Sequence, residues 1–278
     1  MMGTANHEHR LLPDEAVEHY HSAGYVFPID AIPPSMARDA ARRIETLSAN
    51  PPAHLKHPWN LKAHLLLDWI YALTVHPAVL DAVESVIGPD VLMQAADLFV
   101  KPAHGRRHIN WHQDANYWGL EPFEICTAWI ALTDVFPENG CMRFLPGTHL
   151  QSKVEHIETF AEDSALTRGQ EIALDIDGDK AVPVILKAGQ VSLHHCLLAH
   201  ASGQNRTDRP RIGLAIRYMP ASIRQTDGPP MSAILVRGED RYGHFERDEP
   251  PAGELDPASV AAHDRSMAPH APSGYATA

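Results

Sequence analysis

The spacing of apolar positions divides the chain into a helical part before residue 90 and a β-rich part after it. Met36, Ala40 and Ile44 recur at the spacing of one helix face, directly after a Pro-Pro pair that is typical of a helix start. Similar patterns predict helices at about residues 13–23, 33–48, 65–73 and 77–88, and a short strand at 25–29. The N-terminal part is therefore expected to be mostly helical.

After residue 90 the apolar residues come in short runs bounded by Gly, Pro, Asn and Asp, which is the pattern of β-strands. We expect strands at residues 91–101, 125–133, 141–146, 182–186, 190–200 and 211–219. Many short strands at irregular spacing indicate a jelly roll or a barrel, whereas a parallel sheet would alternate strands with helices.

Three of these strands carry one face suited to a hydrophobic core and one suited to a cavity, because side chains alternate along a strand. In the strand at 211–219, small residues stand between two arginines on one face, and large apolar residues fill the other. The expected cavity faces are Arg211, Gly213, Ala215 and Arg217; Thr127, Trp129 and Ala131; and Ser192, His194, Cys196, Leu198 and His200. The face with two arginines leaves room for a ligand that lies along the strand.

Composition and charge narrow the class of protein. The chain has 278 residues, 44% of them hydrophobic and 21% charged, with a formal net charge of −12. This balance is ordinary for a soluble enzyme, and the acidic surplus argues against a nucleic-acid or anionic-membrane surface. Basic residues cluster only locally, at 106–108 and 206–211, which favours a small anionic ligand. We therefore expect a small-molecule substrate, and neither nucleic acid nor a membrane as partner.

Cysteine usage and the N-terminus bear on the compartment. The chain has three cysteines, Cys126, Cys141 and Cys196, and no CxxC pair, so a structural zinc site or a disulfide framework is not expected. The sequence begins without a basic and then apolar leader, and no run approaches about 18 apolar residues. We expect a reduced, cytoplasmic protein.

The stretch His112-Gln113-Asp114 carries the clearest chemical signal. Side chains at positions i and i+2 of a strand point the same way, so His112 and Asp114 can chelate one ion. His200, from a neighbouring strand, would complete the two-histidine, one-carboxylate facial triad of a non-haem Fe(II) oxygenase. Arg211 follows at an offset that suits a dicarboxylate ligand of such an iron.

Three motifs stand in order along the middle of the chain. They are Trp111-His112-Gln113-Asp114, the stretch from Asn139 to His149, and the stretch from His200 to Asn205 followed by Arg211. In order and spacing they resemble the phytanoyl-CoA dioxygenase family of Fe(II)/2-oxoglutarate-dependent oxygenases, over about residues 90–220. The resemblance implies a mainly β fold with flanking helices. The expected core is a double-stranded β-helix (cupin-type jelly roll) with the N-terminal helices packed on one sheet.

The expected domain organisation follows from the element pattern and the resemblance. We expect a single oxygenase domain over residues 1–238, with a helical part at 10–90 and a jelly-roll core at 91–220. Residues 239–278 are expected to form an acidic, Pro-rich and partly disordered tail.

The resemblance also assigns residues to the iron and to 2-oxoglutarate. It implies that the catalytic iron ligands are His112, Asp114 and His200. Arg211 would bind the distal carboxylate of 2-oxoglutarate, where the forked guanidinium suits a bidentate pair better than lysine does. Further co-substrate contacts are expected from the Ser202 hydroxyl and from Trp129 and Thr127, which share a strand face.

Two other histidines compete with His200 for the third ligand position. His195 falls on the opposite face of the expected strand, and His194 shares the inward face. Only His200 is followed by Ser202 and Arg211 at the spacing of the family. His194 is therefore expected beside the iron site and not as a ligand.

The implied reaction is a hydroxylation. With Fe(II), 2-oxoglutarate and O2 as cofactors, the enzyme would hydroxylate an unactivated carbon of a small molecule and convert 2-oxoglutarate to succinate and CO2. The expected substrate is a secondary metabolite or an amino-acid-like compound, as in natural-product biosynthesis. Halogenases of the family carry Ala or Gly at the carboxylate position, so Asp114 favours hydroxylation over chlorination. Desaturation, cyclisation and epoxidation stay open, and a non-catalytic cupin-type binding protein is the alternative of another class.

Four further residues are candidates for the substrate pocket. Tyr117 and Trp118 follow the metal motif and either wall the pocket or belong to the core. Arg217 either reaches a substrate carboxylate or is a solvated strand end. Arg107 either touches the substrate from its loop or is solvated there.

Overall fold

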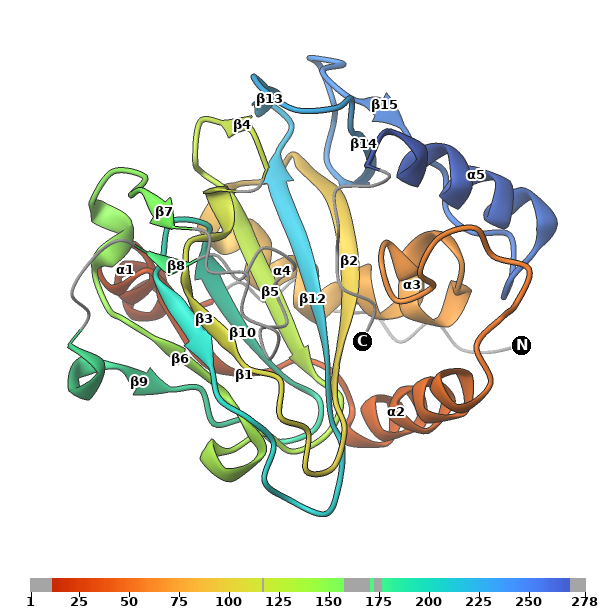
Figure 1. Cartoon of the computed structure of the whole chain (residues 1–278). Helices are drawn as coiled ribbons and strands as arrows, with labels where there is room; N and C mark the ends of the chain where they lie inside the picture. The colour runs from red at the N-terminus through yellow and green to blue at the C-terminus, as the bar shows by residue number, and fades with distance from the viewer. Residues whose placement is uncertain (1–11, 117, 158–170, 173–176, 271–278) are drawn as a thin grey trace.

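The computed structural model describes residues 12–116, 118–157, 171–172 and 177–270 (Figure 1). Its N-terminal part is helical, as predicted. The elements are α1 (Asp14–Ala23), β1 (Tyr25–Asp30), α2 (Pro34–Ala49), the 3-10 turn η1 (Ala63–Leu65), α3 (Asp68–Thr74) and α4 (Pro77–Ile87). Gly24 ends α1 with a φ of 89°, a left-handed conformation that glycine adopts without a steric penalty. The segment expected as one helix at 65–73 is instead a 3-10 turn followed by a short helix.

The rest of the described chain consists mainly of short strands. They are β2 (Val91–Lys101), β3 (Ile109–His112), β4 (Leu120–Glu121), β5 (Cys126–Ala131), β6 (Met142–Phe144), β7 (His156–Ile157), β8 (Glu171–Ile172), β9 (Val182–Pro183), β10 (Gln190–His195), β11 (His200–Ser202), β12 (Arg211–Pro220), β13 (Arg224–Gln225), β14 (Ser232–Arg237) and β15 (Glu246–Arg247). Between them lie the 3-10 turns η2 (Asp114–Asn116), η3 (Pro137–Asn139), η4 (Thr148–Leu150) and η5 (Gly178–Lys180). After β15 follow α5 (Pro257–Met267) and η6 (Ala268–His270).

Two sheets hold most of these strands. A seven-stranded sheet has the order β1-β10-β5-β12-β2-β14-β15, and a four-stranded sheet has the order β3-β11-β6-β9. Neighbouring strands are antiparallel except for β14 and β15. An apolar cluster joins the two sheets, with Trp129 and Ala131 of β5 packed near Met142 and Phe144 of β6. The fold is therefore mixed α/β with a large, mainly antiparallel sheet and N-terminal helices.

The main hydrophobic core lies between the large sheet and the N-terminal helices. The strand faces predicted to be apolar on β5 and β12 both belong to it. The core joins Ala37, Ile44, Leu73, Val79 and Val83 of the helices to Ala128, Ile130, Ile212, Leu214, Ile216 and Tyr218 of the sheet. The opposite faces of β5 and β12 are thereby left for a cavity, as the alternation of residues predicted.

The prediction of one strand over residues 190–200 is wrong. β10 ends at His195, the chain turns with the Leu198 amide donating to the His195 carbonyl, and β11 begins at His200. The two strands belong to different sheets, so the expected alignment of five side chains along one strand does not exist. The chain crosses here from the large sheet to the small one.

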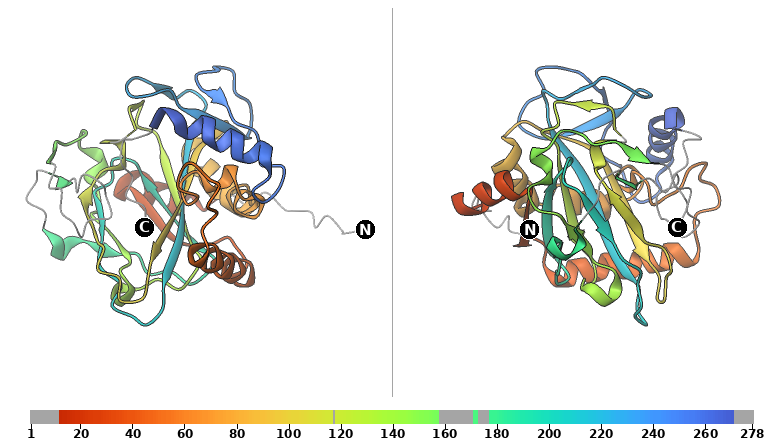
Figure 2. Two further views of the ribbon diagram at one scale, coloured as in Figure 1. Left: turned by 45° about the vertical axis from the view of Figure 1, so that its right-hand side comes forward. Right: turned by 60° about the vertical axis from the view of Figure 1, so that its left-hand side comes forward.

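The segment after residue 238, for which a partly disordered tail is expected, is not irregular throughout residues 239–270. It contains β15 and α5, and α5 lies beside the N-terminal helical layer (Figure 2). A His263 ring nitrogen lies 2.9 Å from the Leu61 carbonyl, and the Leu255 amide donates to the Leu66 carbonyl. These contacts are long-range in sequence, which is why composition alone did not indicate them. The division of the chain into one domain and a tail stays a prediction.

Among the described residues, no single helix is long and apolar enough to cross a membrane. α3 and α4 meet the length and composition requirement only as a pair bent by 46°. Their apolar residues, among them Ile70, Leu73, Leu80 and Val83, lie in the main core.

Candidate active site

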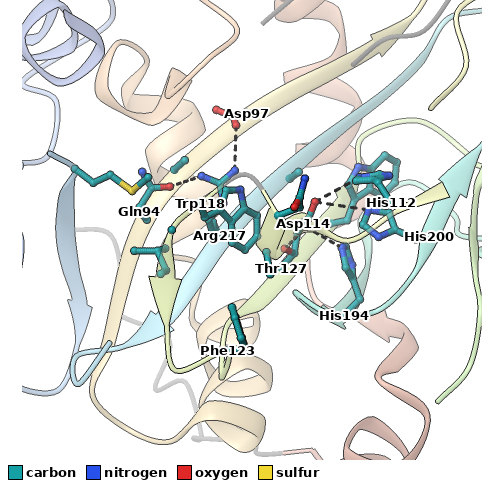
Figure 3. Close-up of a pocket in the computed structure, with 18 of the residues that line it drawn as sticks. Gln94, Asp97, His112, Asp114, Trp118, Phe123, Thr127, His194, His200 and Arg217 are labelled. Carbon is teal, nitrogen blue, oxygen red and sulfur yellow. Dashed lines mark hydrogen bonds and ion pairs between the residues drawn. The ribbon is translucent and has the colours of Figure 1, made fainter. Parts of the chain in front are cut away.

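The three predicted iron ligands lie together at the junction of the two sheets (Figure 3). His112 ends β3 and is the direct cross-strand partner of His200 in β11. β3 stops at His112, and Asp114 is the first residue of η2, so the predicted chelate is formed by a strand end and a turn. One ligand atom from each residue lies within 4.8 Å of the others. The Asp114 Oδ1 atom is 3.5 Å from His112 Nε2 and 3.8 Å from His200 Nε2.

The second nitrogen of each imidazole fixes which nitrogen faces the centre. His112 Nδ1 lies 2.9 Å from the Asn110 carbonyl, and His200 Nδ1 lies 2.9 Å from the Leu198 carbonyl. A carbonyl only accepts, so each Nδ1 carries a proton, and Nε2 is the nitrogen of each ring that is left to bind a metal ion. Both Nε2 atoms face Asp114. This donor set, two imidazoles and one carboxylate on one face, fits a divalent iron.

The electrostatics of the cluster keep its groups in the form that a metal ion needs. Burial opposes ionisation of Asp114, but His200, His112 and His194 outweigh it and hold the pKa of Asp114 well below its usual range. Burial, aided by His112, lowers the pKa of His200 to about 3. At neutral pH the carboxylate is therefore ionised and the His200 imidazole is neutral, as metal binding requires.

The second oxygen of Asp114 is held by residues of the large sheet. Thr127 Oγ1 donates a hydrogen bond to Asp114 Oδ2 at 3.0 Å, and His194 Nε2 lies 3.6 Å from the same oxygen. Thr127 was predicted to contact the co-substrate; it lines the cavity, and its hydroxyl lies on the predicted iron ligand Asp114. His194 lies beside the site, as expected, and neither ring nitrogen has a hydrogen-bond partner among the described residues.

Gln113 anchors the turn that carries Asp114. Its side chain donates to the Leu197 carbonyl and accepts from the Val154 amide, both at 2.9 Å, while its own amide donates to His156 Nε2 at 3.0 Å. The residue between the two predicted ligands is thus buried and fully engaged. This arrangement ties the Asp114 turn to the β10–β11 turn.

Arg211 lies deep in the cavity wall, 2% exposed, at the start of β12. One guanidinium nitrogen donates to the Gly140 carbonyl at 2.8 Å, and the guanidinium carbon lies 5.2 Å from the centre of the Trp129 ring. Its Nε atom has no partner among the described residues. Burial lowers the pKa of Arg211 to about 10, so it stays charged at neutral pH. A buried cation without a paired carboxylate in the described chain fits a site for an anionic ligand.

Sequence reasoning missed Lys101, which completes this group. Lys101 ends β2 and pairs directly across the strands with Arg211. Its Nζ donates to Ser202 Oγ at 2.9 Å and also to the Gly203 carbonyl. The signal was a lysine at the end of a largely apolar strand. Lys101 lies beside Arg211 only because of the register between β2 and β12, and that register cannot be read from the sequence.

A cavity of about 900 Å³ extends from the three predicted iron ligands, and several other predicted residues line it. Thr127, Trp129, Ser202 and Arg211 line it near the cluster, and Trp118 and Arg217 line it further along. The Arg217 guanidinium stacks 3.9 Å from the Trp118 ring centre, bonds to the Gln94 side chain and lies 3.9 Å from Asp97 Oδ2 (Figure 3). Arg217 is thus not a solvated strand end. Arg107 is exposed and does not line the cavity, and Tyr117 lies outside the described residues.

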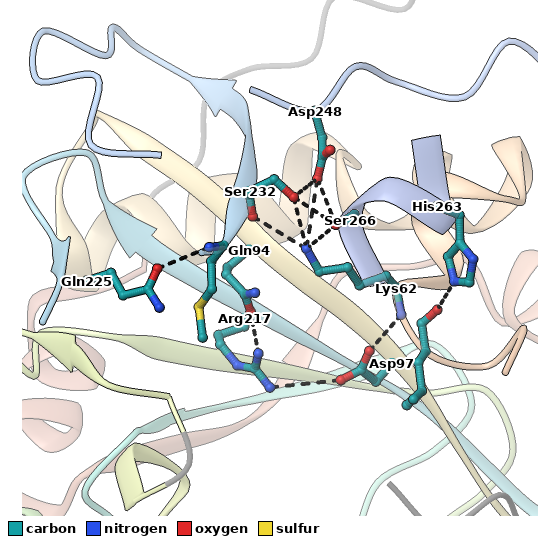
Figure 4. A network of polar contacts seen from close by, with 11 residues as sticks. Lys62, Gln94, Asp97, Arg217, Gln225, Ser232, Asp248, His263 and Ser266 are labelled. Atoms are coloured by element: carbon teal, nitrogen blue, oxygen red, sulfur yellow. Dashed lines mark hydrogen bonds and ion pairs between the residues drawn. The ribbon is translucent and has the colours of Figure 1, made fainter. Parts of the chain in front are cut away.

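The far end of the cavity is built around Lys62 (Figure 4). The Lys62 ammonium donates to Ser266 Oγ at 2.7 Å and Ser232 Oγ at 3.3 Å, and lies 3.9 Å from Asp248 Oδ2. Its backbone amide donates to Asp97 at 2.8 Å. Burial lowers the pKa of Lys62 to about 8, although Asp248 and Asp97 oppose this effect. The network ties the C-terminal segment to the N-terminal helices and to the end of the cavity.

With this geometry in view, comparison with known proteins identifies the family. The family model "Phytanoyl-CoA dioxygenase (PhyH)" matches residues 9–213. The chain belongs to the phytanoyl-CoA dioxygenase family. Its members are Fe(II)/2-oxoglutarate-dependent dioxygenases, and Fe(II) and 2-oxoglutarate are the cofactors of this enzyme class.

Individual relatives agree with this assignment. Human peroxisomal phytanoyl-CoA dioxygenase is 30% identical over 156 residues, which are 54% of this chain and 46% of that protein. The chain spans about half the length of the curated relatives it matches. The non-heme monooxygenase ThoJ in its apo form is 37% identical, with a TM-score of 0.80 over 91% of this chain and 95% of ThoJ. The carbocyclase SnoK from nogalamycin biosynthesis is 25% identical, with a TM-score of 0.59 over 88% and 95% of the two chains.

Proposed function

We propose that this protein is an Fe(II)/2-oxoglutarate-dependent dioxygenase that hydroxylates an unactivated carbon of a small molecule, with conversion of 2-oxoglutarate to succinate and CO2. The observation that carries the proposal is the convergence of His112, Asp114 and His200 at one end of a cavity of about 900 Å³. A double-stranded β-helix core is part of the proposal, supported by two antiparallel sheets with the cluster at their junction.

Each group near the cluster has a role that follows from its contacts. His112, His200 and Asp114 would hold the iron on one face. Thr127 donates to Asp114 Oδ2, whereas His112 and His200 lie nearest Oδ1, so Thr127 would hold the carboxylate in place while Oδ1 faces the two histidines. When bound, iron and 2-oxoglutarate together supply the activation of dioxygen.

Arg211, Ser202 and Trp129 form the proposed 2-oxoglutarate pocket. The Arg211 guanidinium is held in place by the Gly140 carbonyl on one side and lies near the Trp129 ring on the other. Its orientation is thus set before a ligand arrives, which lowers the entropy lost on binding. The buried surroundings strengthen the pairing of this cation with the distal carboxylate.

Asp114 decides between two reaction outcomes. A carboxylate at this position occupies the place that halogenases of the family leave open for a halide, so hydroxylation is favoured. Desaturation, cyclisation and epoxidation use the same cofactors, and a mass spectrum of the product separates them. A non-catalytic binding protein is disfavoured because the three predicted ligands and Arg211 all lie at one cavity.

The size of the cavity bears on the substrate. Its volume of about 900 Å³ lies near the upper end of the ~300–1,000 Å³ range of pockets for drug-sized ligands. Trp118, Phe123 and Ala215 add apolar surface along its walls. Arg211, Ser202 and Trp129 of the proposed 2-oxoglutarate pocket line the same cavity, so the substrate would take the remaining, more apolar part, which suits a secondary metabolite.

The site assignment is tested by anaerobic addition of Fe(II) and 2-oxoglutarate. We expect the weak visible charge-transfer band of an Fe(II)–2-oxoglutarate chelate in the native protein. The band should be absent from His112→Ala and His200→Ala and retained in His54→Ala, which removes an exposed histidine outside the cavity. No band in the native protein, or a band in both site variants, contradicts the assignment. Substrate-stimulated succinate formation across metabolite classes, followed by product mass, then tests the reaction.

A further inference from the structure

The hydroxyl of Ser202 is oriented from behind by Lys101. The Lys101 side chain donates to Ser202 Oγ at 2.9 Å and to the Gly203 carbonyl. Ser202 faces the cavity, whereas Lys101 does not line it. Because Ser202 Oγ accepts the bond from Lys101, its own hydrogen is available to an acceptor on the cavity side.

Lys101 and Arg211 form a buried basic pair with no carboxylate partner in the described chain. They face each other across β2 and β12, and their exposed fractions are 6% and 2%. The other titratable group near Lys101 is Cys141, whose thiol pKa is raised by burial, so it offers no negative charge at neutral pH. The remaining contacts come from neutral groups: Ser202 and Gly203, and Asn205, which donates to the Lys101 carbonyl at 3.1 Å.

The protonation of Lys101 therefore depends on whether an anion is present. Burial, with a further contribution from Arg211, lowers the pKa of Lys101 to about 6. Without a ligand, the amine is mostly neutral at pH 7. A carboxylate beside Arg211 and Ser202 places a negative charge near Lys101 and favours its ammonium form.

We propose that Lys101 is a positioning residue for the co-substrate: it orients the Ser202 hydroxyl toward the distal carboxylate of 2-oxoglutarate and takes up one proton from solvent when that dicarboxylate binds. The inference rests on the proposed function, because Arg211 and Ser202 must form the 2-oxoglutarate pocket. The proton ends on Lys101 Nζ, and the added positive charge offsets one negative charge of the ligand.

The affinity for 2-oxoglutarate should depend on pH through Lys101. The pKa of Lys101 is higher with the ligand than without it, so binding takes up a proton above the ligand-free value of about 6. The affinity for 2-oxoglutarate then falls as the pH rises, by up to about tenfold per pH unit. Below pH 6 Lys101 is already charged, and the dependence disappears.

The proton uptake is measured by calorimetric titration of 2-oxoglutarate into the anaerobic, Fe(II)-loaded full chain in buffers of different ionisation enthalpy. 2-Oxobutyrate is the matched probe, since it has the same keto acid group but no distal carboxylate. Near pH 7.5, we expect the protein to take up about one more proton when it binds 2-oxoglutarate than when it binds 2-oxobutyrate. Equal uptake with both probes would overturn the proposal, and this comparison needs no variant.

Variants separate a positioning role from a merely structural one. Lys101→Met should weaken 2-oxoglutarate binding by about 10- to 100-fold near neutral pH and abolish both the extra proton and the pH dependence. Lys101→Arg should restore affinity without proton uptake, and Lys187→Met, at an exposed lysine, should change nothing. Unchanged pH dependence in Lys101→Met refutes the role of Lys101. Undiminished binding in Arg211→Met refutes the pocket itself, so the two failures are distinguishable.

Discussion

Gly213 lies where β12 passes the Trp129 ring, and we expect Gly213→Ala to reduce both stability and 2-oxoglutarate affinity. A Cβ atom at this position would overlap three atoms of the six-membered part of the indole. The φ of Gly213 is not in the left-handed region, so the backbone itself accepts alanine. Trp129 is buried and lies beside Arg211, so the ring has little room to yield. The whole cost is therefore one of packing.

The magnitude is the difference between two opposing effects. Overpacking a well-filled site by one methyl group costs ~1–3 kcal/mol. Replacing glycine where the backbone is compatible gains ~0.4–1 kcal/mol by restricting the unfolded chain. Taking the middle of each range, the net loss in the free energy of unfolding is about 1–2 kcal/mol, or about 2–8 °C in Tm at about 2–4 °C per kcal/mol. If the displaced ring moves Arg211, the same energy weakens 2-oxoglutarate binding by about 5- to 30-fold.

Denaturant unfolding and anaerobic 2-oxoglutarate titration measure the two effects. Gly253→Ala is the matched control, because a Cβ atom there meets nothing within 4 Å. A double-mutant cycle with Trp129→Val decides the mechanism, since the added methyl group has no ring to strike in that background. The coupling energy should exceed about 1 kcal/mol. If Gly213→Ala costs the same with and without the indole, the clash with Trp129 is not the cause and the reasoning fails.

Three further predictions concern the other parts of the site. Thr127→Val should weaken Fe(II) binding by about 10- to 100-fold by calorimetry, because Asp114 loses its hydroxyl donor, while Thr127→Ser should keep native affinity. Removing metal with a chelator should lower stability by about 2.7 kcal/mol relative to protein with free Fe(II) at about 100 times its Kd, and His200→Ala should show no such shift. Lys62 has a pKa of about 8 in the folded state, against 10.5 for a free lysine side chain. The unfolded chain binds more protons between these values, so this group's contribution to stability rises with pH. Lys62→Met should flatten that rise in urea unfolding, and an unchanged slope would contradict it.

The parts of the fold that follow from sequence are those fixed by neighbouring residues. On β12, Ile212 and Ile216 enter the core while Arg211 and Arg217 line the cavity, as alternation predicted. A strand buried on one face and lining a cavity on the other shows this period directly. The starts of α2 and α4 were also predicted from local sequence, because Pro34 and Pro77 stand at the first helical position, where proline favours initiation.

The parts that did not follow depend on which strands pair. Nothing local breaks the run from Gln190 to His200, since it contains neither glycine nor proline. The turn at 196–199 exists because β10 pairs with β1 and β5, whereas β11 pairs with β3 and β6. The position of Lys101 beside Arg211 likewise depends on strand pairing, namely on the register of β2 and β12. The order of a C-terminal segment rich in Pro, Asp and Glu arises from contacts to residues near 61–66, far away in sequence.

His200 was placed at the predicted iron site from a strand that the structure does not contain. Counting by twos from Ser192 placed it on the inward face of one long strand, and that strand does not exist. What directs the His200 ring toward Asp114 is its pairing with His112 across β3 and β11, with the two ring centroids 4.1 Å apart. A slip of one residue in that register would turn the ring to the other face of the sheet and remove it from the centre. The geometry of the proposed iron site is therefore set by a pairing between two short strands of the small sheet, and changes that weaken this pairing should reduce metal affinity even when all three ligands are retained.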